Sequence, residues 1–248
     1  MQKRTILFAV MFGFALVLGA PIGLVAADAD WLLEAETLFA ARHDMANVQR
    51  SIELLRQVIE REPSNAEAYW RLARSLRWVA EKSTVNRLQK YEEAMKAAEK
   101  AAELNPNNAD VQFWLAACIG SWGEERGVLQ SLFAVKPIKE ALDRALEIDP
   151  NYADAYYVLS QLYRKAPGRP LSIGNKKLAL EAAQKAVRLE PDNTSFVLEL
   201  AEAQLANNMK AEAKKNLELV LSMPPTPDEP VESSEDKEYA RQLLAKLK

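Results

Sequence analysis

PNYADAYY, at residues 150–157, is one of four closely similar phrases in this chain of 248 residues. The others are PSNAEAYW at 63–70, PNNADVQF at 106–113 and PDNTSFVL at 191–198. Each phrase follows an apolar stretch with helical spacing, and each begins with a proline, which cannot continue a helix. A phrase that recurs at a nearly constant interval indicates a repeat architecture, in which each unit packs on its neighbours. We therefore expect an all-α chain of stacked helix pairs.

Small residues accompany these prolines at fixed places. Ala101, Ala145 and Ala186 each lie five residues before a proline. A leucine followed by a small residue marks each following helix, at Leu72-Ala73, Leu115-Ala116, Leu159-Ser160 and Leu200-Ala201. Small side chains let two helices approach closely, with ridges packed into grooves. The Asn or Asp that follows each proline is suited to cap the next helix.

In these marks the chain resembles the tetratricopeptide (TPR) repeat, a pair of antiparallel helices. The resemblance implies a TPR-like α-solenoid of about five helix pairs over residues 28–248. It also implies a concave face that binds partners and carries no chemistry of its own.

The spacing of the repeats departs from the TPR pattern. Successive prolines are 43, 44 and 41 residues apart, whereas a TPR unit has ~34 residues. The extra residues fall near 80–89, 118–136 and 164–177. Every glycine after Gly23 lies in the second or third of these insertions. Because glycine permits turns that other residues disfavour, we expect shaped loops there rather than longer helices.

Two insertions carry a narrower resemblance. CIGSWGEERG at 118–127 and IKEALDRALEIDP at 138–150 are similar to the regulator-of-microtubule-dynamics group of TPR proteins and their bacterial relatives. Residues 166–179 are similar to the periplasmic T-component associated with TRAP transporters, although this chain has no cysteine near its start to accept a lipid anchor. The resemblances imply a protein-binding adaptor or an accessory of a substrate-binding-protein transporter.

The chain begins with an apolar segment. Residues 5–27 carry no charge and follow Lys3 and Arg4. This order is typical of a secretory signal peptide cleaved after Ala27. An uncleaved membrane anchor is the alternative, because the run is long enough to cross a bilayer. In either case we expect the repeats to lie outside the cytoplasm, in a bacterial periplasm.

The other end of the chain predicts a cap. MPPTPDEP at 223–230 is too rich in proline to be helical. After it, Ser233 or Ser234 is suited to start a last helix over 234–247, whose apolar face would cover the final repeat.

Composition argues against several classes of protein. Without residues 1–27 the chain has 30 basic and 35 acidic residues, a balance that disfavours nucleic acid as the partner. It has one histidine, His43, and no enzyme motif, so no catalytic residue, metal site or cofactor is expected. The single cysteine, Cys118, is interpreted as a buried apolar side chain. Asn193-Thr194-Ser195 matches a glycosylation sequon but is interpreted as a repeat junction.

The predicted binding surface is the concave groove. The TPR resemblance places recurring positions of each first helix there, and these are Trp70, Arg74, Arg77, Trp78, Phe113, Ala117, Tyr157, Gln161 and Arg164. Aromatic and arginine side chains dominate protein-binding hot spots, so such a groove suits a peptide or helix with acidic and apolar side chains. The alternative is that Trp70, Phe113 and Tyr157 only pack between repeats.

The insertions add Trp122, Arg126, Arg169, Lys176 and Lys177 as candidates. Trp122 either folds back onto the stack or anchors a partner. The basic cluster over 164–177 either receives an acidic partner or anionic lipid head groups, or is simply solvated. A small ligand would require a deep cavity near Trp122 and Phe133. We expect the partner to be another envelope protein or a peptide segment, and the sequence leaves the oligomeric state open.

Overall fold

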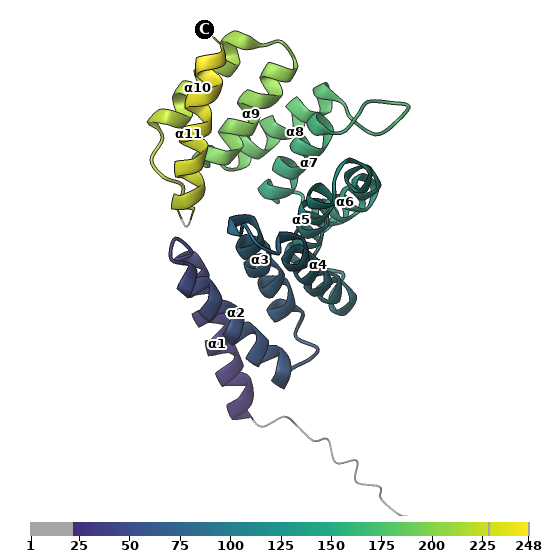
Figure 1. The fold of residues 1–248 in the computed structure, drawn as a ribbon, viewed down its shortest axis with the longest axis vertical. Coiled ribbons are helices and arrows are strands. Elements are labelled where there is room, and N and C mark those ends of the chain that lie inside the picture. The colour runs from purple at the N-terminus through teal and green to yellow at the C-terminus, as the bar shows by residue number, and fades with distance from the viewer. Residues whose placement is uncertain (1–21, 228, 248) are drawn as a thin grey trace, which may run out of the picture.

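The structure is a computed structural model that describes residues 22–227 and 229–247, with side-chain surroundings from residue 30. Eleven α-helices form the regular structure of this part of the chain (Figure 1). They are α1 (Ile22–Ala40), α2 (Met45–Arg61), α3 (Ala66–Lys82), α4 (Arg87–Leu104), α5 (Ala109–Arg126), α6 (Val128–Ile148), α7 (Ala153–Lys165), α8 (Lys176–Leu189), α9 (Thr194–Ala206), α10 (Lys210–Ser222) and α11 (Pro230–Lys246).

The helices pack in sequence order as five pairs, α1–α2 to α9–α10, with α11 against the last pair. The predicted all-α solenoid with a terminal helix is confirmed. The stack curves into an arc, so that the lower end of α11 comes near the turn between α1 and α2 (Figure 1). In the described residues the single β-type contact is an isolated bridge between Gly168 and Gly174.

The four prolines separate the repeats as expected. The helices α2, α4, α6 and α8 each end two residues before a proline, because proline keeps its preceding residue out of the helical conformation. Asn65, Asn108 and Asn193 then accept hydrogen bonds from backbone N–H groups at the start of α3, α5 and α9. The same position before α7 is Tyr152, which makes no side-chain cap.

The small residues of the repeat form the seams between helices. Ala101, Ala145 and Ala186 are fully buried, as are Ala73 and Ala116. Their size lets successive helices approach closely enough to bury a continuous core.

Cys118 is fully buried in the same seam, as predicted. Its thiol lies 3.9 Å from the carbonyl oxygen of Ala73 on α3. Burial raises the pKa of Cys118 to about 12, so the thiol is neutral and packs as a small apolar group.

The prediction of a shaped loop over 118–136 is wrong. Helix α5 continues to Arg126 and α6 starts at Val128, so Gly127, with φ of 99°, is the one residue between them. Gly120 and Gly123 lie inside α5 and face α6. A Cβ atom on Gly123 would be 3.0 Å from Cβ of Ala134. These glycines therefore allow two long helices to cross closely.

The other insertions and the C-terminal helix differ in detail from the prediction. The first insertion is reduced to a turn between Lys82 and Arg87, and the third is a loop over 166–175. Helix α11 begins at Pro230, because proline suits the first turn of a helix. The predicted N-cap at Ser233 or Ser234 is therefore wrong: Ser233 is buried inside the first turn.

Most of the predicted signal segment, residues 1–21, lies outside the described residues. Among the helices that are described, none combines the length and apolar character needed to cross a membrane.

Candidate functional site

A cavity of about 770 Å³ opens on the concave side of the arc. Its walls come from the first helix of each pair (α1, α3, α5, α7 and α9) and from α11. Six of the predicted groove residues line it: Trp70, Arg74, Arg77, Trp78, Phe113 and Tyr157. The repeat positions thus bring together side chains that are up to 87 residues apart in the sequence.

The aromatic side chains of the groove also join neighbouring repeats. The rings of Trp70 and Trp114 stack with centroids 6.5 Å apart and planes 6° apart. The ring of Phe113 lies 5.4 Å from that of Tyr152, and the ring of Tyr157 lies 5.3 Å from that of Phe196. Trp70 and Phe113 are 8% and 7% exposed, so packing accounts for most of their surface. The packing of these residues between repeats is therefore confirmed, and their binding of a partner stays a prediction.

The arginines of the groove are held by acidic or polar groups of the chain itself. Arg74 donates hydrogen bonds to both carboxylate oxygens of Glu36, at 3.0 and 2.7 Å, and lies 4.0 Å from the ring of Phe39. Burial alone would raise the pKa of Glu36, but Arg74 and Arg71 hold it below its usual range. Arg77 donates to the hydroxyl of Ser121 at 2.8 Å. These arginines connect repeats and are not free for a partner.

Carboxylates dominate the charge of the cavity. The predicted groove residues included no acidic side chain. Its lining contains three arginines and eight acidic residues, namely Glu36, Glu81, Asp110, Asp154, Glu229, Glu232, Glu235 and Asp236. Burial raises the pKa of Asp154 to about 6, helped by the charges of Glu190 and Asp110. Burial also raises the pKa of Glu229 to about 7, with Asp154 and Glu232 adding to the shift. The lining is therefore mainly acidic, and its three arginines come from the first two repeats.

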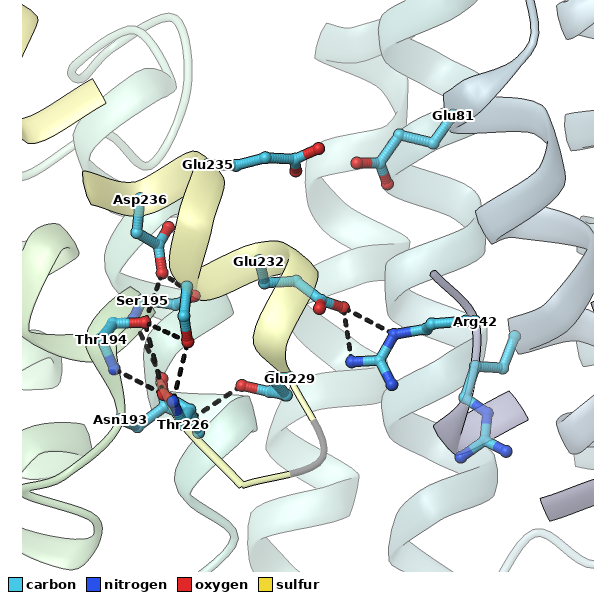
Figure 2. Close-up of polar contacts among 12 residues, drawn as sticks. Arg42, Glu81, Asn193, Thr194, Ser195, Thr226, Glu229, Glu232, Glu235 and Asp236 are labelled. Atoms are coloured by element: carbon cyan, nitrogen blue, oxygen red, sulfur yellow. Dashed lines mark hydrogen bonds and ion pairs between the residues drawn. The ribbon is translucent and has the colours of Figure 1, made fainter. Parts of the chain in front are cut away.

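Helix α11 and Glu229, the residue before it, supply half of these carboxylates and span the gap between the ends of the arc (Figure 2). On the side of the first two repeats, Glu232 accepts two hydrogen bonds from Arg42, at 2.9 and 2.7 Å, and Glu235 pairs with Lys82. Glu229, Glu232 and Asp236 are three and four residues apart, a spacing that places side chains on one face of a helix. This spacing could have predicted the acidic side of the cavity.

A cluster of hydroxyl groups holds α11 to the start of α9 (Figure 2). The Thr194 hydroxyl donates to Asp236 at 2.7 Å and lies within hydrogen-bond distance of the Ser233 hydroxyl, at 3.1 Å. Ser195 also donates to Asp236, at 2.7 Å. Asn193, predicted to belong to a repeat junction, is 6% exposed and donates to Glu229 at 3.2 Å. Thr194 is buried, and both its backbone N–H and its hydroxyl group make hydrogen bonds in this cluster.

A second cavity of about 560 Å³ lies between α5, α6 and α7 and is mostly apolar. It shares Arg77, Phe113 and Tyr157 with the first cavity and is also lined by Gln161 and Ala117. The cavity lies near Trp122 and Phe133, where a ligand cavity was expected, because their neighbours Ser121, Leu132 and Ala134 line it, although Trp122 and Phe133 themselves do not. Phe133 is 74% exposed on α6, because the insertion is helical and turns that face outward.

The remaining candidates lie away from both cavities. Arg164 bridges α7 to α9 through Glu199, at 2.7 Å, and Glu202, at 3.0 Å. Arg126 lies 5.1 Å from the half-buried ring of Trp122. Arg169, Lys176 and Lys177 are exposed around the loop before α8. In the described part of the chain, His, Cys, Asp and Glu side chains form no group of three that is placed to hold a metal ion.

Comparison with known proteins identifies the family and the fold. Residues 31–165 match the family model described as regulator of microtubule dynamics protein 1-3. Among solved structures, the TPR protein TTC0263 of Thermus thermophilus is 16% identical, with a TM-score of 0.66, covering 87% of this chain and 99% of its own. PilF of Pseudomonas aeruginosa is also 16% identical, with a TM-score of 0.60, covering 91% and 93%. No curated protein matches the sequence. The fold is therefore that of a TPR solenoid.

Proposed function

The chain belongs to the regulator of microtubule dynamics protein 1-3 family, and from this premise we propose that it is a non-enzymatic scaffold that binds a protein partner in its concave groove. The observation that carries the proposal is the cavity of about 770 Å³, to which every first helix of the stack contributes. A surface built by a stack of repeats is extended and rigid, as protein-binding solenoids require. Its lining contains Trp and Tyr side chains, which are common in binding hot spots.

We further propose that the scaffold acts outside the cytoplasm, in the envelope of a bacterial cell. The support is the order of residues in 1–27, which have a basic start, an uncharged apolar stretch and small residues at the end. The mass of the purified protein distinguishes the two forms of this proposal: a mature chain that starts at Asp28 indicates cleavage, and an intact one indicates an anchor.

Site-specific photo-crosslinking tests the groove. A crosslinking amino acid replaces Tyr157, which lines both cavities and is half-buried, in the full-length protein. The matched control replaces Glu103, which is 69% exposed on α4 and lines neither cavity. We expect one partner to be crosslinked from position 157 and not from position 103. Equal labelling at both positions, or labelling at position 103 alone, would overturn the groove as the binding surface.

The apolar cavity of about 560 Å³ supports a second candidate, an accessory role in a substrate-binding-protein transporter of the TRAP type. Such a cavity suits a small apolar molecule with one polar end, near Gln161 or Lys165. Native mass spectrometry of the purified protein would then show a bound small molecule, and Ala117→Phe, which fills the cavity, would remove it. A ligand-free protein, or a ligand that persists in the variant, contradicts this candidate.

A further inference from the structure

We infer that the part of the groove formed by the first two repeats is a docking surface for an acidic helix, and that the chain's own helix α11 covers this surface in the closed structure. The inference rests on the proposed function, because it names the class of partner and the way the partner is admitted. The surface consists of Arg42, Trp78 and Lys82 and is called the basic wall below.

The contacts of α11 show what the basic wall recognises. Glu232 pairs with Arg42 at 2.7 Å, and Glu235, one helical turn later, pairs with Lys82 (Figure 2 shows Glu232 and Arg42). Val231 packs on the apolar core of the first repeats, which includes Trp78. Two carboxylates three residues apart and a neighbouring apolar side chain therefore fit this wall. This is the acidic and apolar helix that the sequence of the groove predicts as its ligand.

The attachment of α11 is unequal on its two sides. Toward α9 and α10 it is held by a buried core that contains Ala240 and by the hydroxyl cluster around Ser233. Toward the basic wall, no Cα atom of α11 comes within 8 Å of a Cα atom of α1, α2 or α3. Long charged side chains span that distance. The contact with the wall can therefore open while both ends of the solenoid stay folded.

Unused hydrogen-bonding groups remain on both sides of this contact. Trp78 is 6% exposed, yet its indole N–H has no acceptor. Both hydrogen bonds from Arg42 go to one oxygen of Glu232, and the other oxygen has no donor. The unpaired indole N–H of Trp78 lies beside Arg42 and Lys82, and this combination favours the binding of a further carboxylate to the wall. The fit of α11 is thus incomplete, and a partner with one more acidic group would bind the wall better.

Arg42 itself requires an acidic neighbour in every state. It is 6% exposed, and a buried arginine without a carboxylate is strongly unfavourable. Because α11 is tethered, it competes at an effective concentration on the order of millimolar. A partner helix must therefore supply its own carboxylates and exceed this local competition, which makes the wall selective for strongly acidic helices.

A peptide with the sequence of residues 229–247 tests the inference, with binding to the full-length protein measured by fluorescence anisotropy. In Glu232→Arg/Glu235→Arg the protein's own α11 is repelled from the wall, so we expect the peptide to bind at least about tenfold more tightly than to wild type. Adding Arg42→Glu and Lys82→Glu restores internal pairs of reversed sign and should abolish peptide binding. Glu238→Arg, at an exposed position of α11, is the matched control and should behave as wild type.

Spin labels on cysteines that replace His43 and Arg241 report whether the arc opens. We expect a longer distance between them in Glu232→Arg/Glu235→Arg than in wild type, and the wild-type distance in the four-residue variant. An unchanged distance overturns the inference, because the ion pairs would then not hold α11 in place. An open arc that does not bind the peptide overturns it as well. Either result leaves the crosslinking from position 157 intact, so failure of this inference and failure of the groove as a binding surface are distinguishable.

Discussion

Glu229 and Asp154 line the same cavity, where burial removes much of the water that would stabilise their charged forms. The pKa of Glu229 is raised to about 7 and that of Asp154 to about 6. Around Glu229 lie Arg42, Glu232 and the amide of Asn193, and the arginine offsets only part of the effect of burial. At this scale the sequence predicted Arg74, Arg77 and several aromatic residues of the groove, but not Arg42. It could not predict the contact of Arg42 with the acidic side, because Glu229 and Glu232 lie more than 180 residues from Arg42.

The raised pKa values predict a stability that depends on pH. The folded chain holds protons on Glu229 and Asp154 that the unfolded chain releases near pH ~4, so the free energy of unfolding falls as pH rises from there to about 7 and then levels off. Between roughly pH 5 and pH 8 we expect Glu229 to contribute a loss of about 1–2 kcal/mol, reduced by solvent screening. Urea denaturation of Glu229→Gln should show a flatter pH profile, while Glu238→Gln should keep the wild-type slope. Identical profiles for all three proteins would contradict this account.

The helix pair α5–α6 shows why element boundaries were harder to predict than elements. Four prolines and three asparagine caps marked the ends of most helices in advance. The glycines of residues 118–127 were interpreted as turn residues, although Gly120 and Gly123 are inside a helix. Sequence alone does not separate glycine that permits a turn from glycine that permits close packing, because the second role depends on a neighbouring helix.

These two glycines give opposite predictions for the stability of the pair. A Cβ atom on Gly123 would already lie 3.0 Å from Ala134, so Gly123→Val should lower the free energy of unfolding by about 1–3 kcal/mol. A Cβ atom on Gly120 would meet Ile138 at an ordinary 3.6 Å. Gly120→Ala should therefore raise the free energy of unfolding by about 0.5–1 kcal/mol, the usual effect of alanine in a helix. Thermal and urea denaturation measure both, and a Gly123→Val protein as stable as wild type would refute the close crossing.

The arc of the whole molecule closes through side chains at its two ends. The repeat pattern was sufficient to predict the stack of five helix pairs, because each pair depends mainly on local contacts, and the residues after 223–230 predicted the final helix. They were not sufficient to predict that the arc closes. Closure depends on the sum of small rotations between repeats and on charges at the two ends, Arg42 and Lys82 against Glu232 and Glu235. No single repeat contains that information.

Closure by ion pairs predicts that salt widens the arc. The screening length falls from about 10 Å at 0.1 M salt to about 3 Å at 1 M, so the attraction between α11 and the first two repeats weakens while apolar packing within each repeat does not. Small-angle X-ray scattering should show a larger radius of gyration at high salt, with an unchanged helical circular dichroism signal. Arg42→Glu places like charges at the contact, so this variant should have a larger radius of gyration already at low salt. Adding more salt should change that radius little. A wild-type radius that is independent of salt would mean that apolar contacts, such as Val231 on the first core, hold the ends together.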